Sequence, residues 1–268
     1  MVSLETLKRW IPRWRSECRH PTRLFCFPYA GGNANVFSRW ESFTCGNVEI
    51  LPVQLPGRQE RFLEPAFATI DMLTKELAEV LFPLLDRPYG LFGHSLGALV
   101  SFELARILSQ NGLPPAYLFV SARAAPQRMR TDRKKCSLLD DLHLVKELRD
   151  LNGTPPGILE NIELLEVLLP SIRSDFSLVD NYIFVPGKRL RCAISAFGGL
   201  LDQKVSRPDL EGWSELSSGK FTLRMFPGDH FFLHGQETQL LGAIECDLRL
   251  LLGSRYVCIQ SQTCNKVI

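Results

Sequence analysis

The sequence has no hydrophobic run long enough to cross a bilayer, which takes about 20 consecutive apolar residues. The N-terminal segment 1–20 carries basic residues but lacks the continuous apolar core of a secretory signal. The formal net charge is only +2 over 268 residues, whereas binding nucleic acid needs a strongly basic face. We therefore expect a cytoplasmic protein with no membrane span and no nucleic-acid partner.

Cysteine pairs at metal-binding or redox spacing are also absent. None of the eight cysteines forms a Cys-x-x-Cys pair, and a chain of this length does not depend on a disulfide framework. Cys26 and Cys192 lie inside apolar runs, where a thiol packs as a small hydrophobic group. We expect all the cysteines to be reduced, and we expect no zinc site and no other metal.

No internal repeat, low-complexity segment or linker divides the chain. The content of 45% hydrophobic and 22% charged residues is ordinary for a soluble globular protein with a substantial core. We predict one domain over residues 1–268. Residues 1–22 are expected to form a peripheral, partly disordered lead-in, and the tail from Ser254 is expected to be loosely held.

Short apolar runs alternate with amphipathic segments along most of the chain. The runs have the length of buried strands, and they cover residues 23–27, 49–53, 89–92, 116–121, 191–197 and 221–226. Helical spacing of apolar residues marks the segments 70–85, 96–108 and 240–251. Strands that alternate with helices through short loops imply right-handed crossovers. The sequence therefore predicts an α/β fold with a mostly parallel sheet flanked by helices.

The alternation stops between about residues 140 and 182, where helical periodicity continues without a strand. The segment Asn152–Gly157 contains two prolines and two glycines and interrupts this helical stretch. We predict a helical insertion over about residues 138–185 that forms a lid over the carboxyl edge of the sheet. The alternative is that these helices belong to the ordinary outer layer of the fold.

The motif Gly93-His94-Ser95-Leu96-Gly97 joins a predicted strand to a predicted helix. Gly-x-Ser-x-Gly in this setting is typical of a nucleophile elbow, in which a sharp turn exposes the serine above the sheet. The glycines lack side chains where the strand and the helix crowd each other. We predict that Ser95 is a catalytic nucleophile. The alternative is a glycine-flanked turn with a solvated serine.

A serine nucleophile needs a general base, and the base needs an acid that orients it. In α/β-hydrolases the acid and the histidine follow the serine in chain order. Asp202 follows a predicted strand and a Gly-Gly turn, and His230 follows the last predicted strand. Because both lie at carboxyl ends of strands, they meet at the edge of the sheet where ligand sites form. The sequence therefore predicts Ser95, Asp202 and His230 as the catalytic residues.

Other residues compete for these roles. Asp229 adjoins His230, although it could instead cap the next helix. His234 lies four residues beyond His230, but a histidine pair without a third ligand or a zincin glutamate is weak evidence for a metal. Asp175 and Asp180 fall in the predicted insertion and are poorly placed to orient the base.

The oxyanion of an acyl-transfer intermediate needs backbone donors. One is the N–H of Leu96, at the start of the helix after the nucleophile, and the other comes from the turn after the first core strand. In this turn Tyr29 comes first, and Ala30 and Gly31 follow it. We predict oxyanion donors at Tyr29 and Leu96 and substrate contacts at Ala30 and Gly31. The glycines of this turn could also serve only its tight geometry.

Four motifs in order resemble those of type II thioesterases, the stand-alone editing enzymes of nonribosomal peptide and polyketide synthesis, which have the α/β-hydrolase fold. The motifs are Phe27–Gly32, Gly93–Gly97, Gly198–Asp202 and Gly228–Phe232. The segments Leu55–Arg58 and Gly153–Pro156 extend the resemblance, which runs from about residue 22 to 252.

The resemblance implies a Ser-Asp-His hydrolase with no cofactor of its own. It implies a substrate in which a misprimed short acyl or aminoacyl group is thioester-linked to the phosphopantetheine arm of an acyl or peptidyl carrier protein. We expect a monomer that meets this partner transiently. Two other functions stay open: a medium-chain fatty acyl carrier-protein thioesterase with a longer pocket, and a catalytically silent α/β-hydrolase that only binds a ligand or partner.

A basic cluster precedes the predicted insertion. Its members lie within eight residues, namely Arg128, Arg130, Arg133, Lys134 and Lys135. Carrier proteins are usually acidic, and opposite charges steer encounter. Arg133, Lys134 and Lys135 are therefore candidates for carrier docking, and the alternative is a solvated charged loop.

Overall fold

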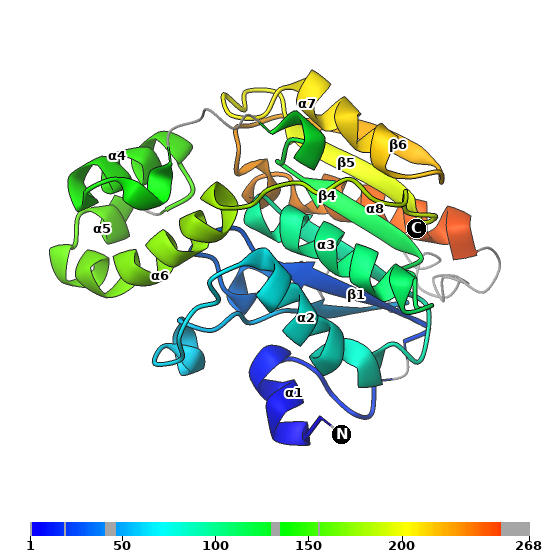
Figure 1. Cartoon of the computed structure of the whole chain (residues 1–268). Helices are drawn as coiled ribbons and strands as arrows, with labels where there is room; N and C mark the ends of the chain where they lie inside the picture. Colours follow the sequence, from blue (N-terminus) through cyan, green and yellow to red (C-terminus); the bar gives the residue numbers. More distant parts are fainter. Residues whose placement is uncertain (1, 19, 41–46, 130–134, 155, 253–268) are drawn as a thin grey trace, which may run out of the picture.

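A six-stranded sheet forms the centre of the molecule (Figure 1). The computed structural model describes residues 2–18, 20–40, 47–129, 135–154 and 156–252. The strands are β1 (Thr22–Phe27), β2 (Val48–Pro52), β3 (Tyr89–His94), β4 (Tyr117–Ser121), β5 (Ala193–Gly199) and β6 (Phe221–Phe226). They lie in the order β2-β1-β3-β4-β5-β6, and each neighbouring pair is parallel. The predicted parallel sheet is confirmed, and each predicted strand lies within two residues of the observed one at either end.

Helices cover both faces of the sheet. The helices outside the insertion are α1 (Leu4–Trp10), α2 (Ile70–Leu81), α3 (Leu96–Gln110), α7 (Arg207–Glu211) and α8 (Glu237–Leu252). Short 3-10 helices lie in the connections, namely η1 (Ala34–Phe37), η3 (Gln59–Arg61), η4 (Phe82–Leu84), η5 (Pro126–Arg128), η6 (Cys136–Leu138), η7 (Gly212–Leu216) and η8 (Phe232–His234). No helix in the part of the chain described above is long and apolar enough to span a bilayer.

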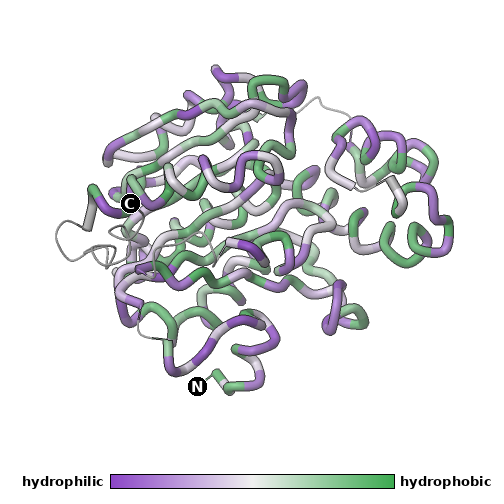
Figure 2. Tube along the Cα trace, turned by 180° about the vertical axis from the view of Figure 1, so that it is seen from behind, coloured by the Kyte–Doolittle hydropathy of each residue, from purple (hydrophilic) through white to green (hydrophobic). Residues whose placement is uncertain are grey.

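Neighbouring residues of each strand serve two different cores, because their side chains point to opposite faces. In β1, Phe25 and Phe27 join the apolar cluster of α2 and α3, whereas Leu24 and Cys26 join the cluster of α8. Figure 2 shows hydrophobic segments running through the interior of the molecule. Each fully buried side chain of this kind contributes about 1.5–3 kcal/mol. Burial on both faces explains why the strands are nearly continuous apolar runs.

Two of the cysteines lie in these cores, as predicted. Cys26 is fully buried and Cys192 is 7% exposed. Burial raises the pKa of the Cys26 thiol well above its usual value and that of Cys192 to about 12, so both stay protonated. Cys45, Cys258 and Cys264 lie outside the described residues.

The sequence predicts a peripheral, partly disordered lead-in over residues 1–22. The predicted disorder is wrong for residues 4–10, which form helix α1 at the periphery of the molecule. The Ser3 side chain caps α1, and Leu7, Trp10 and Ile11 are buried in the apolar cluster that includes α2. The Arg61 guanidinium lies 4.0 Å from the centre of the Trp10 ring, which adds a cation–π contact. A seven-residue helix is too short to show a clear period in the sequence, so only its burial reveals it. The tail from Ser254 lies outside the described residues.

Between β4 and β5, the residues that the structure describes form helices and no named strand. The segment of α4 (Asp141–Leu151), α5 (Pro156–Leu159) and α6 (Ile162–Asp180) is here called the insertion. A small apolar cluster of its own joins its helices, with Leu144, Leu148, Leu159, Leu169 and Ile172. In Figure 1 the insertion stands to one side of the sheet.

Candidate active site

Ser95 occupies the sharp turn between β3 and α3. Its backbone has a φ of 53° and a ψ of −110°, a combination that a residue with a side chain adopts only under strain. A Cβ on Gly93 would lie 2.0 Å from the Gly97 carbonyl oxygen, and a Cβ on Gly97 would lie 2.1 Å from the Phe27 carbonyl oxygen. Only glycine fits at either position, so the motif closes the turn that presents the serine hydroxyl.

Side chains from three strand ends form one hydrogen-bonded chain. His230 Nε2 lies 3.1 Å from Ser95 Oγ, and His230 Nδ1 lies 2.8 Å from Asp202 Oδ2. The Asp202 side chain has no exposed surface, and His230 is 8% exposed. The structure therefore brings the three predicted side chains together in the order that a nucleophile, a base and its orienting acid require.

The competing residues have other partners. Asp229 Oδ2 accepts a hydrogen bond from Asn152 Nδ2 at 2.8 Å, so this carboxylate contacts the insertion. His234 Nε2 lies 3.0 Å from the Tyr29 hydroxyl. Within the described ranges, no group of three or more His, Cys, Asp or Glu side chains is arranged to hold a metal ion.

The predicted oxyanion donors lie on either side of the serine. Leu96 is the first residue of α3, where a backbone N–H has no acceptor within the helix. The positive end of the α3 dipole therefore lies at Ser95. Tyr29 lines the same cavity as Ser95, and its ring packs edge-on against His94, Phe231 and His234.

The two predicted substrate contacts are placed differently. Ala30 lines the cavity at Ser95. The N–H of Gly31 instead donates to Asp175 Oδ2 at 2.7 Å, so the carboxylate occupies this donor. Gly31 has a φ of 76°, a left-handed conformation that favours glycine, and the turn requires it there.

The cavity at Ser95 is small, and residues of the insertion line part of it. Its volume is about 40 Å³. The lining residues come from the β1 loop, the elbow, the insertion and the loop after β6, and they are Tyr29, Ala30, Ser95, Leu148, Leu151, Gly153, Thr154, Phe176, His230 and Phe231. Sites for drug-sized ligands occupy about 300–1,000 Å³. The cavity at Ser95 is much smaller than such sites.

The connection between α4 and α5 rests directly on the loop that carries His230. A Cβ on Gly153 would lie 2.1 Å from Phe231 Cζ, so the backbone there is in contact with the outer end of the ring. Asn152, with a φ of 59°, ends α4 and reaches Asp229. The insertion thus contacts the residues on both sides of His230.

His94 lies beside the base without taking part in the hydrogen-bonded chain. It is fully buried, its ring centre lies 5.6 Å from that of His230, and its Nδ1 lies 2.9 Å from Ser121 Oγ. Burial, reinforced by the nearby His230, holds the pKa of His94 well below its usual value. His94 therefore stays neutral and packs beside the elbow.

Sequence reasoning missed a buried ion pair next to the site. Arg58 Nη2 lies 2.7 Å from Asp175 Oδ1, and the two side chains are 7% and 2% exposed. The one available signal was the motif Leu55–Arg58, which places an arginine at the end of an apolar segment. Nothing in the sequence pairs that arginine with a residue 117 positions away.

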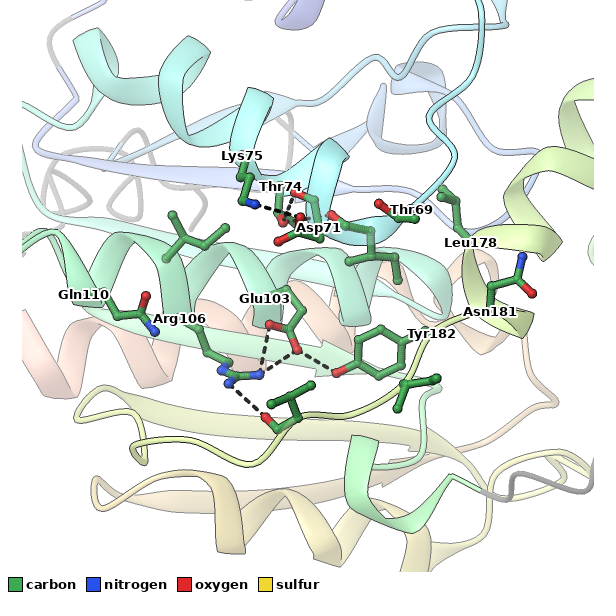
Figure 3. Close-up of a pocket in the computed structure, with 14 residues that line it drawn as sticks. Thr69, Asp71, Thr74, Lys75, Glu103, Arg106, Gln110, Leu178, Asn181 and Tyr182 are labelled. Atoms are coloured by element: carbon green, nitrogen blue, oxygen red, sulfur yellow. Dashed lines mark hydrogen bonds and ion pairs between the residues drawn. The ribbon is translucent and has the colours of Figure 1, made fainter.

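A larger groove lies away from Ser95, between α2, α3 and the segment after α6 (Figure 3). Its volume is about 480 Å³, and its lining includes none of Ser95, Asp202 and His230. The polar side chains in it bind one another, since Glu103 accepts from both Arg106 and Tyr182. This groove is therefore not the candidate active site, despite its size.

Only part of the candidate docking cluster lies within the described residues. Arg133 and Lys134 lie outside the described residues. Lys135 Nζ lies 3.3 Å from Asn181 Oδ1, at the end of α6. Arg128, at the start of the cluster, pairs with Glu215 at 2.5 Å.

Comparison with known proteins identifies a family. A family model described as "Thioesterase domain" matches residues 22–248. Linear gramicidin dehydrogenase LgrE of Brevibacillus parabrevis is 40% identical over 91% of this chain and 94% of its own length. Gramicidin S biosynthesis protein GrsT of Aneurinibacillus migulanus is 38% identical over 95% of this chain and 100% of its own length.

A solved structure supports the same relationship. The type II thioesterase BorB from the borrelidin biosynthetic cluster superposes with a TM-score of 0.83 at 40% identity, covering 90% of this chain and 98% of its own. The α/β-hydrolase fold predicted from the motifs is thereby confirmed.

Proposed function

The chain belongs to the thioesterase domain family, and from this premise we propose that it is a serine thioester hydrolase of nonribosomal peptide or polyketide biosynthesis. It removes misprimed short acyl or aminoacyl groups from the phosphopantetheine arm of an acyl or peptidyl carrier protein, which it meets transiently. One observation carries the proposal: the hydrogen-bonded chain from Ser95 through His230 to Asp202, at the wall of a small cavity. A cytoplasmic location stays a prediction.

The first half-reaction transfers the acyl group to the serine. His230 Nε2 accepts the Ser95 proton as Oγ attacks the thioester carbonyl carbon, and the N–H groups of Tyr29 and Leu96 donate to the oxyanion. The C–S bond then breaks, and His230 returns the proton to the pantetheine sulfur. A thiol with a pKa of about 8.5 is a far better leaving group than an amine.

The second half-reaction hydrolyses the acyl-serine. His230 takes a proton from water, whose oxygen attacks the ester carbonyl, and then returns the proton to Ser95 Oγ as the acid leaves. Asp202, 2.8 Å from His230 Nδ1, holds the tautomer in which Nε2 is free to accept and stabilises the imidazolium.

The size of the cavity favours short acyl groups over a medium-chain substrate. Its volume of about 40 Å³ is far below the range of about 300–1,000 Å³ that is usual for ligand sites. Leu148, Leu151 and Phe176 of the insertion form the wall that a longer chain would have to displace. Acetyl and other small acyl groups require the least displacement.

One relative is named a dehydrogenase, but we do not propose dehydrogenase activity for this chain. A dinucleotide-binding fold carries Gly-x-Gly-x-x-Gly after its first strand. The sequence contains no two glycines separated by one residue. A silent binding protein is also disfavoured, because such a protein gains nothing from a strained serine hydrogen-bonded to a buried histidine.

The test compares the wild type with Ser95→Ala. We expect the wild type to react covalently with a fluorophosphonate probe and to hydrolyse acetyl carrier protein. Ser95→Ala is expected to lose the label and at least about 10³-fold in turnover, leaving only the oxyanion and binding contributions. Near-normal turnover of Ser95→Ala contradicts the proposal.

A panel of acyl groups on one carrier protein tests the substrate class. We expect kcat/KM to be highest for acetyl and small aminoacyl groups and to fall with chain length. A maximum at medium or long chains contradicts the editing function and favours the fatty-acyl alternative.

A further inference from the structure

The loop Tyr29–Gly32 carries one of the two proposed oxyanion donors, yet it lies beyond the end of β1 at Phe27. One backbone hydrogen bond closes its turn, from the Gly32 N–H to the Tyr29 carbonyl at 2.9 Å. The ladder of the sheet does not extend to it. The direction of the Tyr29 N–H therefore depends on the side chains that surround the loop.

Asp175 is the first of these side chains. It lies in α6 and is 1% exposed. Its Oδ2 accepts from the Gly31 N–H at 2.7 Å, and its Oδ1 accepts from Arg58 Nη2 at the same distance. A single carboxylate of the insertion thus holds the loop next to the nucleophile.

Arg58 completes the contact from the other side. Its Nη1 donates to the Gly32 carbonyl at 3.0 Å, so Asp175 and Arg58 together bind an N–H and a carbonyl of consecutive residues. Gln54, which is 2% exposed, extends the network by donating to the Arg58 carbonyl at 3.2 Å. The loop is held at two successive residues by charged side chains that bulk water does not reach.

Close packing adds to the hydrogen bonds. A Cβ on Gly31 would lie 2.9 Å from Ile172 Cγ1, one turn before Asp175 in α6. The loop and the helix are in van der Waals contact, so a shift of one moves the other.

We propose that Asp175 and Arg58 are positioning residues that align the loop Tyr29–Gly32 for oxyanion stabilisation. The inference rests on the proposed function, in which the Tyr29 N–H donates to the oxyanion. Such a donor lowers the barrier only if it is held in place before the reaction. Because the oxyanion forms only along the reaction, misalignment lowers kcat much more than it raises KM. A buried ion pair is by itself weak evidence for stability, since desolvation offsets the attraction.

A second ion pair with a buried carboxylate supplies the control; its arginine side chain is 30% exposed. Arg224 Nη1 and Nη2 contact Asp247 Oδ2 and Oδ1 at 2.6 and 2.7 Å, and Asp247 is 2% exposed. This pair joins β6 to α8 and does not line the cavity at Ser95. Asp247→Asn therefore removes a comparable buried charge away from the reaction.

The experiment compares Asp175→Asn with Asp247→Asn. In Asp175→Asn, the amide NH₂ must face either the Gly31 N–H or Arg58 Nη2, so one of these contacts is lost. With a small acetyl thioester we expect kcat to fall about 10–100-fold, part of the loss typical of removing one oxyanion donor, and KM to stay within about threefold. Asp247→Asn is expected to keep the wild-type kcat, although both variants lower Tm.

A trifluoromethyl ketone provides the second readout. Ser95 Oγ adds to its carbonyl carbon, the hydroxyl proton passes to His230 Nε2, and the ketone oxygen becomes the oxyanion. We expect its affinity for Asp175→Asn to fall by the same factor as kcat/KM. Arg58→Lys, a milder change that keeps the charge but offers one nitrogen in place of the two that bind Asp175 and the Gly32 carbonyl, should show the same pattern.

The outcomes separate the two proposals. A wild type that neither hydrolyses the thioester nor binds the ketone contradicts the proposed function itself. An active wild type whose folded Asp175→Asn and Arg58→Lys variants keep kcat within twofold contradicts the positioning inference alone. A loss that Asp247→Asn shares equally also contradicts it, because the effect would then be one of stability.

Discussion

The two oxygens of the Asp202 carboxylate have different partners. Oδ1 accepts from the N–H groups of Lys204 and Val205, and Oδ2 contacts His230 Nδ1. In Asp202→Asn the amide oxygen stays with the two N–H donors, so the NH₂ group faces Nδ1. Nδ1 must then accept, which puts the imidazole proton on Nε2 and removes the lone pair that takes the Ser95 proton. We expect kcat to fall on the order of 10³–10⁴-fold in steady-state assays.

Asp229→Asn is the matched control, one residue before His230. The amide of this variant would keep an oxygen for the Phe231 N–H and change only the exposed contact with Asn152. We expect kcat within about threefold of the wild type, as for most exposed substitutions. If Asp229→Asn were the more damaging change, Asp229 would be the orienting acid.

Single residues could be predicted where a local sequence motif indicates their position in the fold. Ser95 lies in a Gly-x-Ser-x-Gly turn, and Asp202 and His230 each closely follow an apolar run that reads as a strand. Asp175 carries no such mark, because it is one acid within a helix. Its environment depends on Arg58, which only the folded chain brings to it.

At the scale of elements, the strands could be predicted from the sequence, whereas the first helix could not. The strands were predictable because burial on both faces requires an unbroken apolar run of about five residues. Helix α1 was not predictable, because its seven residues complete only two turns and its burial depends on α2 and on Arg61.

The contact between the insertion and the His230 loop gives a prediction at this scale. In Gly153→Ala, the new methyl group would overlap the Phe231 ring, so the α4–α5 connection or the ring has to move. Phe231 adjoins His230 and lines the cavity with it. We expect kcat/KM for acetyl carrier protein to fall about tenfold, with the loss of Tm that overpacking of about 1–3 kcal/mol causes.

Gly157→Ala tests whether the contact with the ring matters. Gly157 lies four residues further along the insertion, and a Cβ there would meet nothing within 4 Å. We expect wild-type kcat/KM and an unchanged or slightly higher Tm, since alanine favours a helix over glycine by about 1 kcal/mol. Equal losses in both variants would show that the insertion tolerates no substitution and that the ring contact is not the cause.

For the whole molecule, the order of strands and helices predicted a sheet whose carboxyl edge carries the site. The way the insertion packs against that edge was not predictable, because it depends on contacts such as Gly153 with Phe231 and Gly31 with Ile172. Both contacts join residues far apart in the sequence, and both need glycine so that the backbone can approach closely. The sequence alone does not show why glycine is needed at these positions.

Charge is distributed unevenly over the molecule, and this bears on the encounter with a carrier protein. The net charge of +2 conceals the cluster that ends in Arg133, Lys134 and Lys135. Fixed positive charge steers an acidic partner and raises the association rate more than it slows dissociation. Replacing these three residues with serine should lower kcat/KM for acetyl carrier protein several-fold at low salt. The loss should shrink as ionic strength rises, because the screening length is about 8 Å at 0.15 M.

A second variant that loses three positive charges at other sites shows whether the loss in kcat/KM comes from the position of the charges or from the net charge. Lys8→Ser, Lys75→Ser and Lys220→Ser together remove three positive charges from exposed sites on α1, α2 and the turn before β6. We expect this triple variant to keep most of kcat/KM for the carrier substrate, and we expect both triple variants to hydrolyse a small acetyl thioester at the wild-type rate. A small thioester has neither the acidic carrier nor the pantetheine phosphate, so the cluster has nothing to attract. Equal losses on carrier substrate in the two variants would contradict docking at the cluster and leave only a general effect of charge. A loss on the small thioester in the cluster variant would instead point to damage to the adjoining insertion.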